Sequence, residues 1–274
     1  MTLVPNDLPP SAFPAFESLS EEQRAAFASR YDSAKRSMAL MMALSILFPI
    51  QLFFLGKVLL GLLFLITGGG GMLGVDLRDE LLAQDLPFRC LSRSDLDITD
   101  SRAVSAAVEE ARPEVIVNCA AFTKVDEAET NEHTANAING SSVEFLARAA
   151  NRNDALLVHI STDFVFDGSK RTPYEINDPA SPATAYGRSK LLGEIAAAHA
   201  KQHLIIRASW LFGVHGANFV EAIRNQIRKG TDPLRVVNDQ RGRPTYTPHL
   251  ARAILRLVNQ PEARGVVHYA DEPE

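Results

Sequence analysis

The sequence predicts an α/β protein in which helices cover both faces of a parallel sheet. Apolar, β-prone runs recur at Leu62–Thr67, Val115–Ala121 and Leu156–Ile160. Unbroken apolar runs are typical of strands that are covered on both sides. Segments with helical character separate these runs, at Val75–Leu86 and Glu129–Asn151. Such alternation of strands and helices indicates a doubly wound sheet.

Composition limits the class of protein. The chain has 274 residues, long enough for one large domain or two smaller ones. Its 22% charged and 46% apolar residues are ordinary for a globular protein. The net charge of −5 comes without any basic cluster, so we do not expect a nucleic-acid partner, because phosphate binding needs concentrated Lys and Arg.

Cysteine and histidine usage argues against disulfides and metals. Cys90 and Cys119 lie in apolar, strand-like runs and are expected to be buried thiols. Without a CxxC pair or a disulfide framework, a reducing compartment is the simpler expectation. The seven histidines are scattered, so no metal site is predicted.

A glycine-rich turn follows the first predicted strand. Gly68, Gly71 and Gly74 form a G-x-x-G-x-x-G pattern between that strand and the helix predicted over Val75–Leu86. Glycines there permit a tight turn, a close approach of backbone N–H groups to a pyrophosphate, and close packing of helix on strand. The helix N-terminus would favour the phosphates electrostatically. The pattern predicts a dinucleotide-binding, Rossmann-type domain; an ordinary glycine-rich turn is the alternative.

The next predicted strand indicates which dinucleotide binds. Pro87–Leu91 is followed by Ser92 and Arg93 rather than by an acidic residue. A carboxylate at this point would hold an adenosine 2′-hydroxyl, whereas Ser and Arg suit a 2′-phosphate. We therefore expect NADPH, with NADH as the alternative, and Arg93 could also be a solvated surface charge.

A tyrosine and a lysine four residues apart provide candidate acid/base chemistry. Tyr186 and Lys190 would lie one turn apart on one helix face. A neighbouring ammonium favours the phenolate, which would move the tyrosine pKa from ~10 toward neutral pH. Tyr186 could then protonate the carbonyl oxygen of a substrate that is being reduced. Ser161 and Thr162 follow a predicted strand, and a hydroxyl there could hydrogen-bond the same carbonyl oxygen. An exposed helix face and a simple turn are the alternatives for these pairs.

From about Leu62 to its C-terminus the chain resembles the dTDP-4-dehydrorhamnose reductase family of extended short-chain dehydrogenase/reductases. The resemblance is carried by ITGGGGMLG, LDITD, VIVNCAAFTKVDEAE, HISTDFVFDG, PYEINDPASPATAYGRSKLLGE, IIRASWLFG, NFV and VVNDQRGRPT. It implies catalytic roles for Thr162, Tyr186 and Lys190. It also implies that Trp210 lines a sugar-nucleotide site, although the only tryptophan of the chain could equally fill a core.

The expected cofactor and substrate residues follow from the motifs and the resemblance together. Expected cofactor contacts are Gly68, Gly71, Met72, Leu73, Gly74, Ser92, Arg93, Asp97, Ile98, Ala120, Ala121, Thr123, Tyr186 and Lys190. Expected substrate contacts are Ser161, Thr162, Asp163, Trp210, Arg241 and Arg243, the two arginines as candidates for a nucleotide diphosphate or as solvated loop charges.

The resemblance also implies a reaction. Dehydratases of this superfamily carry an acidic pair after the threonine, whereas here Asp163 is followed by Phe164. The expected reaction is NADPH-dependent reduction of the 4-keto group of a nucleotide-linked 4-keto-6-deoxy sugar, in dTDP-rhamnose and cell-surface polysaccharide biosynthesis. The alternatives are a non-catalytic NAD(P)-binding regulatory subunit of the same superfamily, or a membrane protein with a truncated reductase passenger.

The expected organisation has three parts. Residues 1–57 form a leader, a helix and an apolar segment, 58–210 the dinucleotide-binding domain with the Tyr and Lys, and 211–274 a partial substrate lobe. The lobe is expected to contain a helix from Asn218 to about Arg228 and short strands at Leu234–Val237 and Val266–Tyr269. Because the resembling family continues for several more elements, this lobe is expected to be incomplete.

The N-terminal part raises the question of a membrane. Met38–Ile66 is strongly apolar, and Met38–Leu55 just reaches the length that spans a hydrocarbon core. A buried core helix is the alternative. The order of Tyr31, Lys35–Ser37, Phe54–Lys57, Gly61 and Thr67–Gly69 also makes residues 20–70 resemble the TM2-domain family of two-helix membrane proteins. We therefore expect a cytoplasmic catalytic domain, anchored through residues 38–66 if that segment inserts, and a homodimer as a further expected association.

Overall fold

The computed structural model describes residues 63–236 and 239–271. Six parallel strands form the main sheet in the order β2-β1-β3-β4-β5-β8. Their bounds are Phe64–Thr67 (β1), Phe88–Leu91 (β2), Val115–Asn118 (β3), Leu156–Thr162 (β4), His203–Ala208 (β5) and Gly265–Tyr269 (β8). The expected fold class, a doubly wound parallel sheet, is confirmed.

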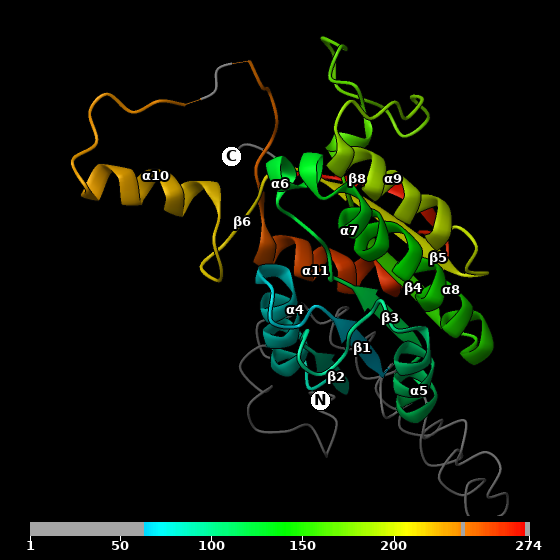
Figure 1. Cartoon of the computed structure of the whole chain (residues 1–274). Coiled ribbons are helices and arrows are strands. Elements are labelled where there is room, and N and C mark those ends of the chain that lie inside the picture. The colour runs from blue at the N-terminus through cyan, green and yellow to red at the C-terminus, as the bar shows by residue number, and fades with distance from the viewer. Residues whose placement is uncertain (1–62, 237–238, 272–274) are drawn as a thin grey trace, which may run out of the picture. The chain divides into compact units, whose positions relative to one another are not determined.

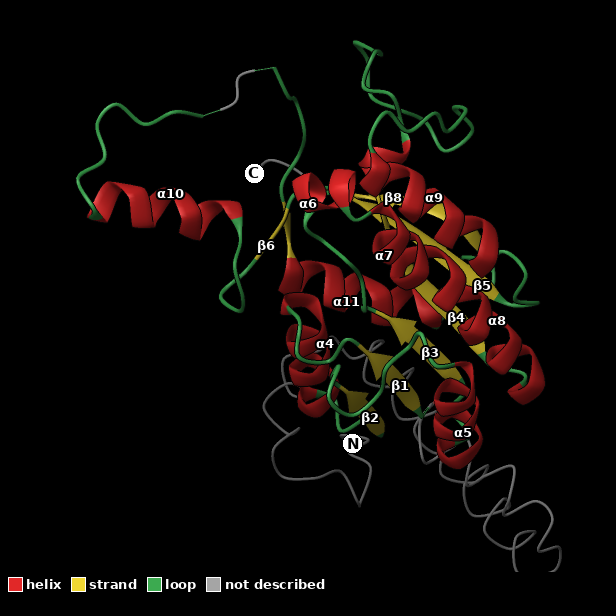
Figure 2. Ribbon diagram, viewed as in Figure 1, coloured by secondary structure: helices red, strands yellow, loops and turns green. Residues whose placement is uncertain are grey.

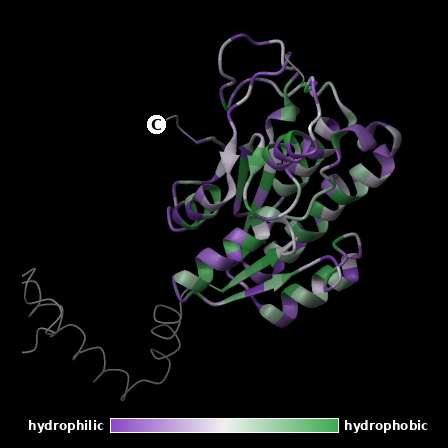
Figure 3. Ribbon diagram, turned by 90° about the vertical axis from the view of Figure 1, so that its left-hand side faces the viewer, coloured by the Kyte–Doolittle hydropathy of each residue, from purple (hydrophilic) through white to green (hydrophobic). Residues whose placement is uncertain are grey.

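Helices cover both faces of this sheet (Figure 1). On one face lie α4 (Met72–Ala83) and α11 (Thr247–Val258), and on the other lie α5 (Ser101–Ala111), α8 (Ser142–Asn153) and α9 (Ala185–Ala197). Figure 2 shows the sheet between these two layers. Because side chains alternate along a strand, each strand contributes to both cores: Ile66 packs toward α4, and its neighbour Leu65 packs toward α5 and α8. Hydrophobic residues accordingly concentrate in the strands (Figure 3).

Shorter elements connect or extend this body. They are α6 (Val125–Thr130), α7 (Glu132–Asn136), a π-turn (Ala137–Ser141), a 3₁₀ turn (Asp163–Val165), α10 (Phe219–Arg228) and a two-stranded sheet of β6 (Leu211–Phe212) with β7 (Thr245–Tyr246). The predicted helix over Glu129–Asn151 is therefore interrupted. At Asn131 the backbone leaves the helical region (φ −124°), and the backbone N–H and the side-chain amide of Asn131 both donate to the Glu127 carbonyl oxygen.

The segment after residue 210 differs from its prediction in two ways. Leu234–Val236 form no regular element, so the short strand predicted at Leu234–Val237 is wrong over these residues; Val237 lies outside the described residues. Leu234 and Val236 are 38% and 49% exposed, and a strand without a packing surface gains little from its β-branched residues. Helix α11 packs on the main sheet and β8 is one of its strands, so part of residues 211–274 belongs to the dinucleotide-binding fold and not to a separate lobe.

The N-terminal predictions mostly fall on residues 1–62, outside the described residues. Within the apolar run, Phe64–Thr67 form strand β1, as predicted. Among the described residues, no helix combines the length and apolar character that crossing a membrane requires. The expected leader, helix and membrane segment therefore stay predictions.

Candidate active site

The glycine turn lies at the carboxyl end of β1 and begins α4. Gly68 has φ +68°, and a Cβ there would lie 2.5 Å from the Ala120 backbone nitrogen. A Cβ at Gly74 would lie 2.5 Å from the Gly68 carbonyl oxygen, so only glycine lets α4 pack this close to the turn. Gly71 is the N-cap of α4 and has no side chain to satisfy the first N–H groups. This leaves the helix N-terminus as the polar floor of an anion cradle.

The predicted cofactor residues come together around this turn. Met72, Leu73 and Gly74 form the first turn of α4, and Ala120, Ala121 and Thr123 follow the neighbouring strand β3. Asp97 and Ile98 lie in the turn between β2 and α5, where Thr99 donates to the Asp97 carboxylate at 2.7 Å and 2.9 Å. The geometry fits a dinucleotide: a glycine cradle with a helix N-terminus and small residues at the next strand end.

The end of β2 contains a carboxylate that the sequence reasoning missed. Arg93 is exposed, as an anchor for a 2′-phosphate would be. The Ser92 hydroxyl, however, donates to Asp95 at 2.5 Å, and the Ser92 N–H donates to the same carboxylate at 2.8 Å. These two bonds hold the pKa of Asp95 below its usual value, so a negative charge lies beside the predicted phosphate anchor. An acidic residue four positions after the strand end was the available signal.

Tyr186 and Lys190 begin α9, which packs on β4. The Thr184 hydroxyl caps this helix by accepting from the Gly187 N–H at 3.0 Å. A Cβ at Gly187 would overlap the Phe164 carbonyl oxygen, and the Phe164 ring meets the Tyr186 ring edge-on at 5.6 Å. These contacts bring the phenol of Tyr186 to the end of β4, where Thr162 lies.

Burial sets the protonation of both predicted acid/base groups. Desolvation raises the pKa of Tyr186 to about 12, and hydrogen bonding to Thr162 offsets this only in part. Desolvation lowers the pKa of Lys190 to about 8, against a smaller opposing effect of Glu194. Lys190 donates from Nζ to the Ile160 carbonyl oxygen at 2.6 Å. The predicted lowering of the Tyr186 pKa is therefore not seen, and Tyr186 keeps its proton at neutral pH.

The two hydroxyls at the end of β4 point to opposite faces. Thr162 donates to the Asp163 carboxylate at 3.0 Å and accepts from the Phe164 N–H at 3.2 Å. Burial raises the pKa of Asp163. Ser161 instead faces α9 and donates to Glu194 at 2.5 Å. The structure thus brings Thr162 and Asp163 to Tyr186 and leaves Ser161 in a separate buried network.

The sequence from residue 63 to the C-terminus matches a known protein family. The model for the RmlD substrate binding domain matches residues 63–274. The chain belongs to this family. A dTDP-4-keto-6-deoxy-D-glucose reductase of Streptomyces niveus is 44% identical over 209 residues, covering 75% of this chain and 71% of the relative. A dTDP-4-dehydrorhamnose reductase of Streptomyces griseus is 43% identical over 196 residues, covering 71% of this chain and 64% of the relative.

Two solved structures agree with the fold. A dTDP-4-dehydrorhamnose reductase from Bacillus anthracis, crystallised in complex with NADP, has a TM-score of 0.74 at 35% identity and covers 78% of this chain and 75% of its own. A Clostridium acetobutylicum dTDP-4-dehydrorhamnose reductase has a TM-score of 0.73 at 38% identity and covers 77% and 75%.

Trp210 lies between β5 and β6, and the predicted substrate arginines lie in the loop that leads to β7. Trp210 adopts φ +48°, an unusual conformation for a bulky side chain. A Cβ at Gly242 would lie 3.1 Å from its indole, and the Phe219 ring lies 6.0 Å away. Arg241 and Arg243 are exposed on either side of Gly242. The loop thus presents both arginines beside Trp210.

Two buried polar groups of this RmlD-family chain were missed by the sequence reasoning. Asn118 accepts from Thr67 at 2.7 Å and donates to His159 at 3.1 Å, which links β1, β3 and β4 below the glycine turn. Asn139, in the π-turn, bonds the Phe122 N–H at 2.7 Å and the Phe122 carbonyl oxygen at 3.0 Å, and its amide also donates to Ser189 at 2.9 Å. It therefore ties the loop after β3 to α9. A single asparagine inside a helical segment gave no usable signal.

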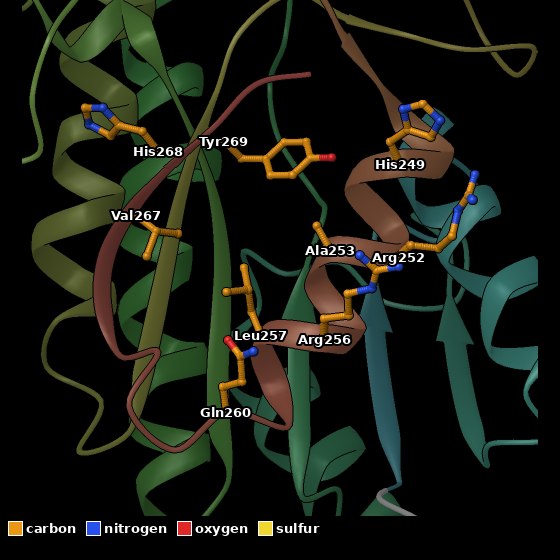
Figure 4. Close-up of a pocket in the computed structure, with 9 residues that line it drawn as sticks. All are labelled: His249, Arg252, Ala253, Arg256, Leu257, Gln260, Val267, His268 and Tyr269. Carbon is orange, nitrogen blue, oxygen red and sulfur yellow. The ribbon is translucent and has the colours of Figure 1, made fainter. Parts of the chain in front are cut away.

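An open pocket of about 420 Å³ lies elsewhere, between α11 and β8 (Figure 4). None of the predicted site residues lines it. Its lining residues are His249, Arg252, Ala253, Arg256, Leu257, Gln260, Val267, His268 and Tyr269. Over the described residues, no group of three or more His, Cys, Asp or Glu side chains could hold a metal ion. Cys90 and Cys119 are free thiols, each only partly buried.

Proposed function

We propose that the chain is an NADPH-dependent reductase that converts dTDP-4-dehydrorhamnose to dTDP-rhamnose. The observation that carries the proposal is that Tyr186 and Lys190 lie at the carboxyl end of β4 with Thr162, in the same parallel sheet whose strand β1 ends in the glycine cradle of Gly68 and Gly74. The names of the relatives support the substrate, and the NADP complex of a relative supports the cofactor. A reductase of this kind belongs to nucleotide-sugar and cell-surface polysaccharide biosynthesis.

The protonation states fit reduction. Bound NADPH supplies the hydride. With a pKa of about 12, Tyr186 holds a proton at neutral pH that it can give to the developing alkoxide of the sugar. Lys190, with a pKa of about 8, is mostly charged and stabilises the phenolate that results. Rotation of the Thr162 hydroxyl can redirect its proton from Asp163 to the sugar oxygen, which supplies an oxyanion-type contact.

The remaining site residues are assigned on the same proposal. The glycine turn, the first turn of α4 and the loop after β3 hold the dinucleotide, with Arg93 at the 2′-phosphate. Trp210, Arg241 and Arg243 line the sugar-nucleotide side. Ser161, committed to Glu194, makes no direct substrate contact in this assignment.

The decisive experiment follows NADPH oxidation by the purified chain with dTDP-4-dehydrorhamnose. Turnover by the wild type, and its loss in Tyr186→Phe with NADPH binding retained, is the expected result. Tyr269→Phe, which removes a phenol from β8 outside the site, serves as the matched control and should keep its activity. NADPH binding without turnover would point to a regulatory subunit instead, and activity in Tyr186→Phe would refute the acid assignment.

Two associations complete the proposal. Residues 38–66 associate with a membrane, as their apolar run indicates, while the reductase domain remains in the cytoplasm with NADPH. A homodimer forms through the outer side of α9, where Leu192 and Ile195 are 46% and 54% exposed. Vesicle flotation and sedimentation velocity of the full chain test the two associations separately; absence of flotation or a monomer would refute them.

A further inference from the structure

A row of polar side chains crosses three strands next to the proposed active site. Ser161, Arg207 and His268 occupy matching positions on β4, β5 and β8 and therefore share one face of the sheet. Glu194 reaches this row from α9, which covers that face. The side chains of Glu194 and Arg207 are only 5% and 8% exposed, so the charges are held away from water.

The Glu194 carboxylate accepts hydrogen bonds from two residues of this row. Arg207 donates to the two oxygens of Glu194 at 2.9 Å and 2.7 Å, in the bidentate geometry that guanidinium favours. Ser161 adds a third donor to the same carboxylate at 2.5 Å. Arg207 also approaches Nε2 of His268 at 3.4 Å. One carboxylate thus joins β4, β5 and α9.

The other side of Arg207 holds the loop that leads to α9. The Phe166 ring lies 5.0 Å from the guanidinium carbon and stacks on Tyr174 at 4.2 Å. Arg207 also donates to the Ile176 carbonyl oxygen at 3.5 Å. Because this loop runs from the Thr162 turn to the first turn of α9, Arg207 ties together the two elements that carry the proposed chemistry.

Glu194 also acts on Lys190, which lies one turn before it on α9. Tyr186, Lys190 and Glu194 are spaced at four residues and so follow one stripe of the helix. The groups that act on Lys190 are Glu194 on its own helix, Cys119 after β3 and His159 on β4. Glu194 opposes the effect of burial on the Lys190 ammonium, whereas burial and Lys190 together keep His159 neutral.

A stabilising role alone explains this arrangement poorly. Two charges removed from water lose hydration that their mutual attraction repays only with excellent geometry, and apolar replacements of such pairs are often neutral for stability. A buried pair that spans the elements of a site has a better explanation in the fixed geometry it imposes.

We propose that the Glu194–Arg207 pair, together with Ser161, is a positioning device that holds the Thr162 end of β4 in register with Tyr186 and Lys190 on α9. The inference rests on the proposed reductase function. It makes Ser161, Glu194 and Arg207 positioning residues, which act through Thr162, Tyr186 and Lys190 rather than on the substrate.

The main test removes both charges at once with Glu194→Leu/Arg207→Met. Because no charge is left unpaired, the double variant should fold and bind NADPH. Its kcat should nevertheless fall about 10- to 100-fold with little change in KM, since small misplacements of catalytic groups cost rates of this size. A folded double variant with wild-type kcat would overturn the proposal.

Two milder variants separate the parts of the device. Ser161→Ala keeps the ion pair and should lower kcat several-fold without moving the pH profile. Glu194→Gln should move the loss of activity at high pH to lower pH, because the Lys190 ammonium loses its neighbouring carboxylate. Glu110→Gln makes the same chemical change at an exposed ion pair with Arg89 and should alter neither kcat nor the pH profile.

A readout without turnover keeps this test separate from the reductase proposal. The side-chain ammonium of Lys190 can be titrated by NMR in protein labelled with ¹⁵N at lysine Nζ. Glu194→Gln should lower the Lys190 pKa even if the wild type reduces no sugar, in which case only the proposed function fails. An unchanged Lys190 titration in a folded Glu194→Gln variant would overturn the link from Glu194 to Lys190.

Discussion

Among single side chains, Lys190 sets the pH range in which the proposed chemistry can run. The residue is 2% exposed, and its pKa of about 8 lies well below the usual 10.5 because burial disfavours the charge. The unfolded chain therefore binds more protons than the folded chain between these two values, and the contribution of Lys190 to stability rises with pH across this window. Any loss of activity above pH 8 thus cannot come from Lys190 destabilising the fold.

We predict that kcat/KM falls about tenfold for each pH unit above the Lys190 pKa of about 8, because the neutral amine no longer stabilises the phenolate of Tyr186. A pH–rate profile of NADPH oxidation, with the folded fraction followed by circular dichroism, measures this. Lys190→Arg keeps a charge at all accessible pH values and should remove the decline near pH 8, whatever its effect on the rate. A wild-type profile that stays flat to pH 10 would contradict the assignment.

The second prediction at this level concerns cofactor choice. Arg93→Ala should weaken NADPH binding about 10-fold or more and leave NADH binding nearly unchanged, because only NADPH carries the 2′-phosphate. A second variant, Asp95→Asn, removes the negative charge near the predicted 2′-phosphate site and should strengthen NADPH binding. Isothermal titration with both cofactors measures the two effects. Equal losses for NADPH and NADH in Arg93→Ala would show Arg93 to be a surface charge.

At the residue level, the local geometry could be predicted from the sequence where spacing along one element decides it. The four-residue interval of Tyr186 and Lys190 and the strand-end position of Thr162 follow from helix and sheet periodicity alone. Ser161 was harder, because its direction depends on which face of β4 the helix α9 covers. Asn139 and Asp95 act through partners 17 and three residues away, and such contacts have no periodic signal.

Among the elements, the glycine turn between β1 and α4 allows the sharpest substitution. A Cβ at Gly74 would lie 2.5 Å from the Gly68 carbonyl oxygen and 2.8 Å from the Gly69 Cα, both of them backbone atoms that cannot rotate away. Gly70, two residues after Gly68, has its nearest neighbour at 3.7 Å, the Cβ of Ser92, and so has room for a methyl group. Alanine at both positions therefore distinguishes the effect of a steric clash at Gly74 from the general effect of replacing a glycine.

We predict that Gly74→Ala lowers the free energy of unfolding by about 1–3 kcal/mol through overpacking, and weakens NADPH binding because α4 moves away from the turn. Gly70→Ala should change each by less than about 0.5 kcal/mol. Urea denaturation and NADPH titration of both variants measure this. If Gly74→Ala binds NADPH as tightly as Gly70→Ala, close packing of α4 on the turn is not what forms the phosphate cradle.

At the level of elements, the sequence predicted strands that are buried on both faces. It failed where tertiary packing decides whether a segment forms a strand or is covered. Strands β1, β3 and β4 are marked by largely apolar runs, since both of their faces are covered. The strand β5 was not predicted. Leu234–Val236 has a similar local composition but no surface to pack against, and it forms no strand. In the same way, α10 is amphipathic by spacing and yet has no buried residue among its described side chains. Sequence periodicity states which face is apolar and not whether anything covers it.

Across the folded unit from residue 63 onward, the proposed cofactor site gathers residues that are far apart in the chain. The glycine turn, the loop after β3 and the helix face with Tyr186 and Lys190 gather at the carboxyl ends of the strands only when β1, β3 and β4 are paired. The order β2-β1-β3-β4 places this meeting point where the chain reverses direction across the sheet, which is where ligands bind in such folds. A ligand that contacts all three segments must therefore bind the folded chain and not the unfolded one.

We predict from this coupling that NADPH raises the melting temperature of the full chain. At 100 times its dissociation constant, a ligand specific for the folded state adds about 2.7 kcal/mol. For a domain of this size the gain corresponds to about 5–10 °C. Tyr186→Phe should keep the shift, because the phenol is proposed to act in proton transfer, whereas Gly74→Ala should lose most of it. Differential scanning calorimetry over a series of NADPH concentrations measures the effect, and a melting temperature that does not depend on NADPH would show that the three segments do not form one binding site.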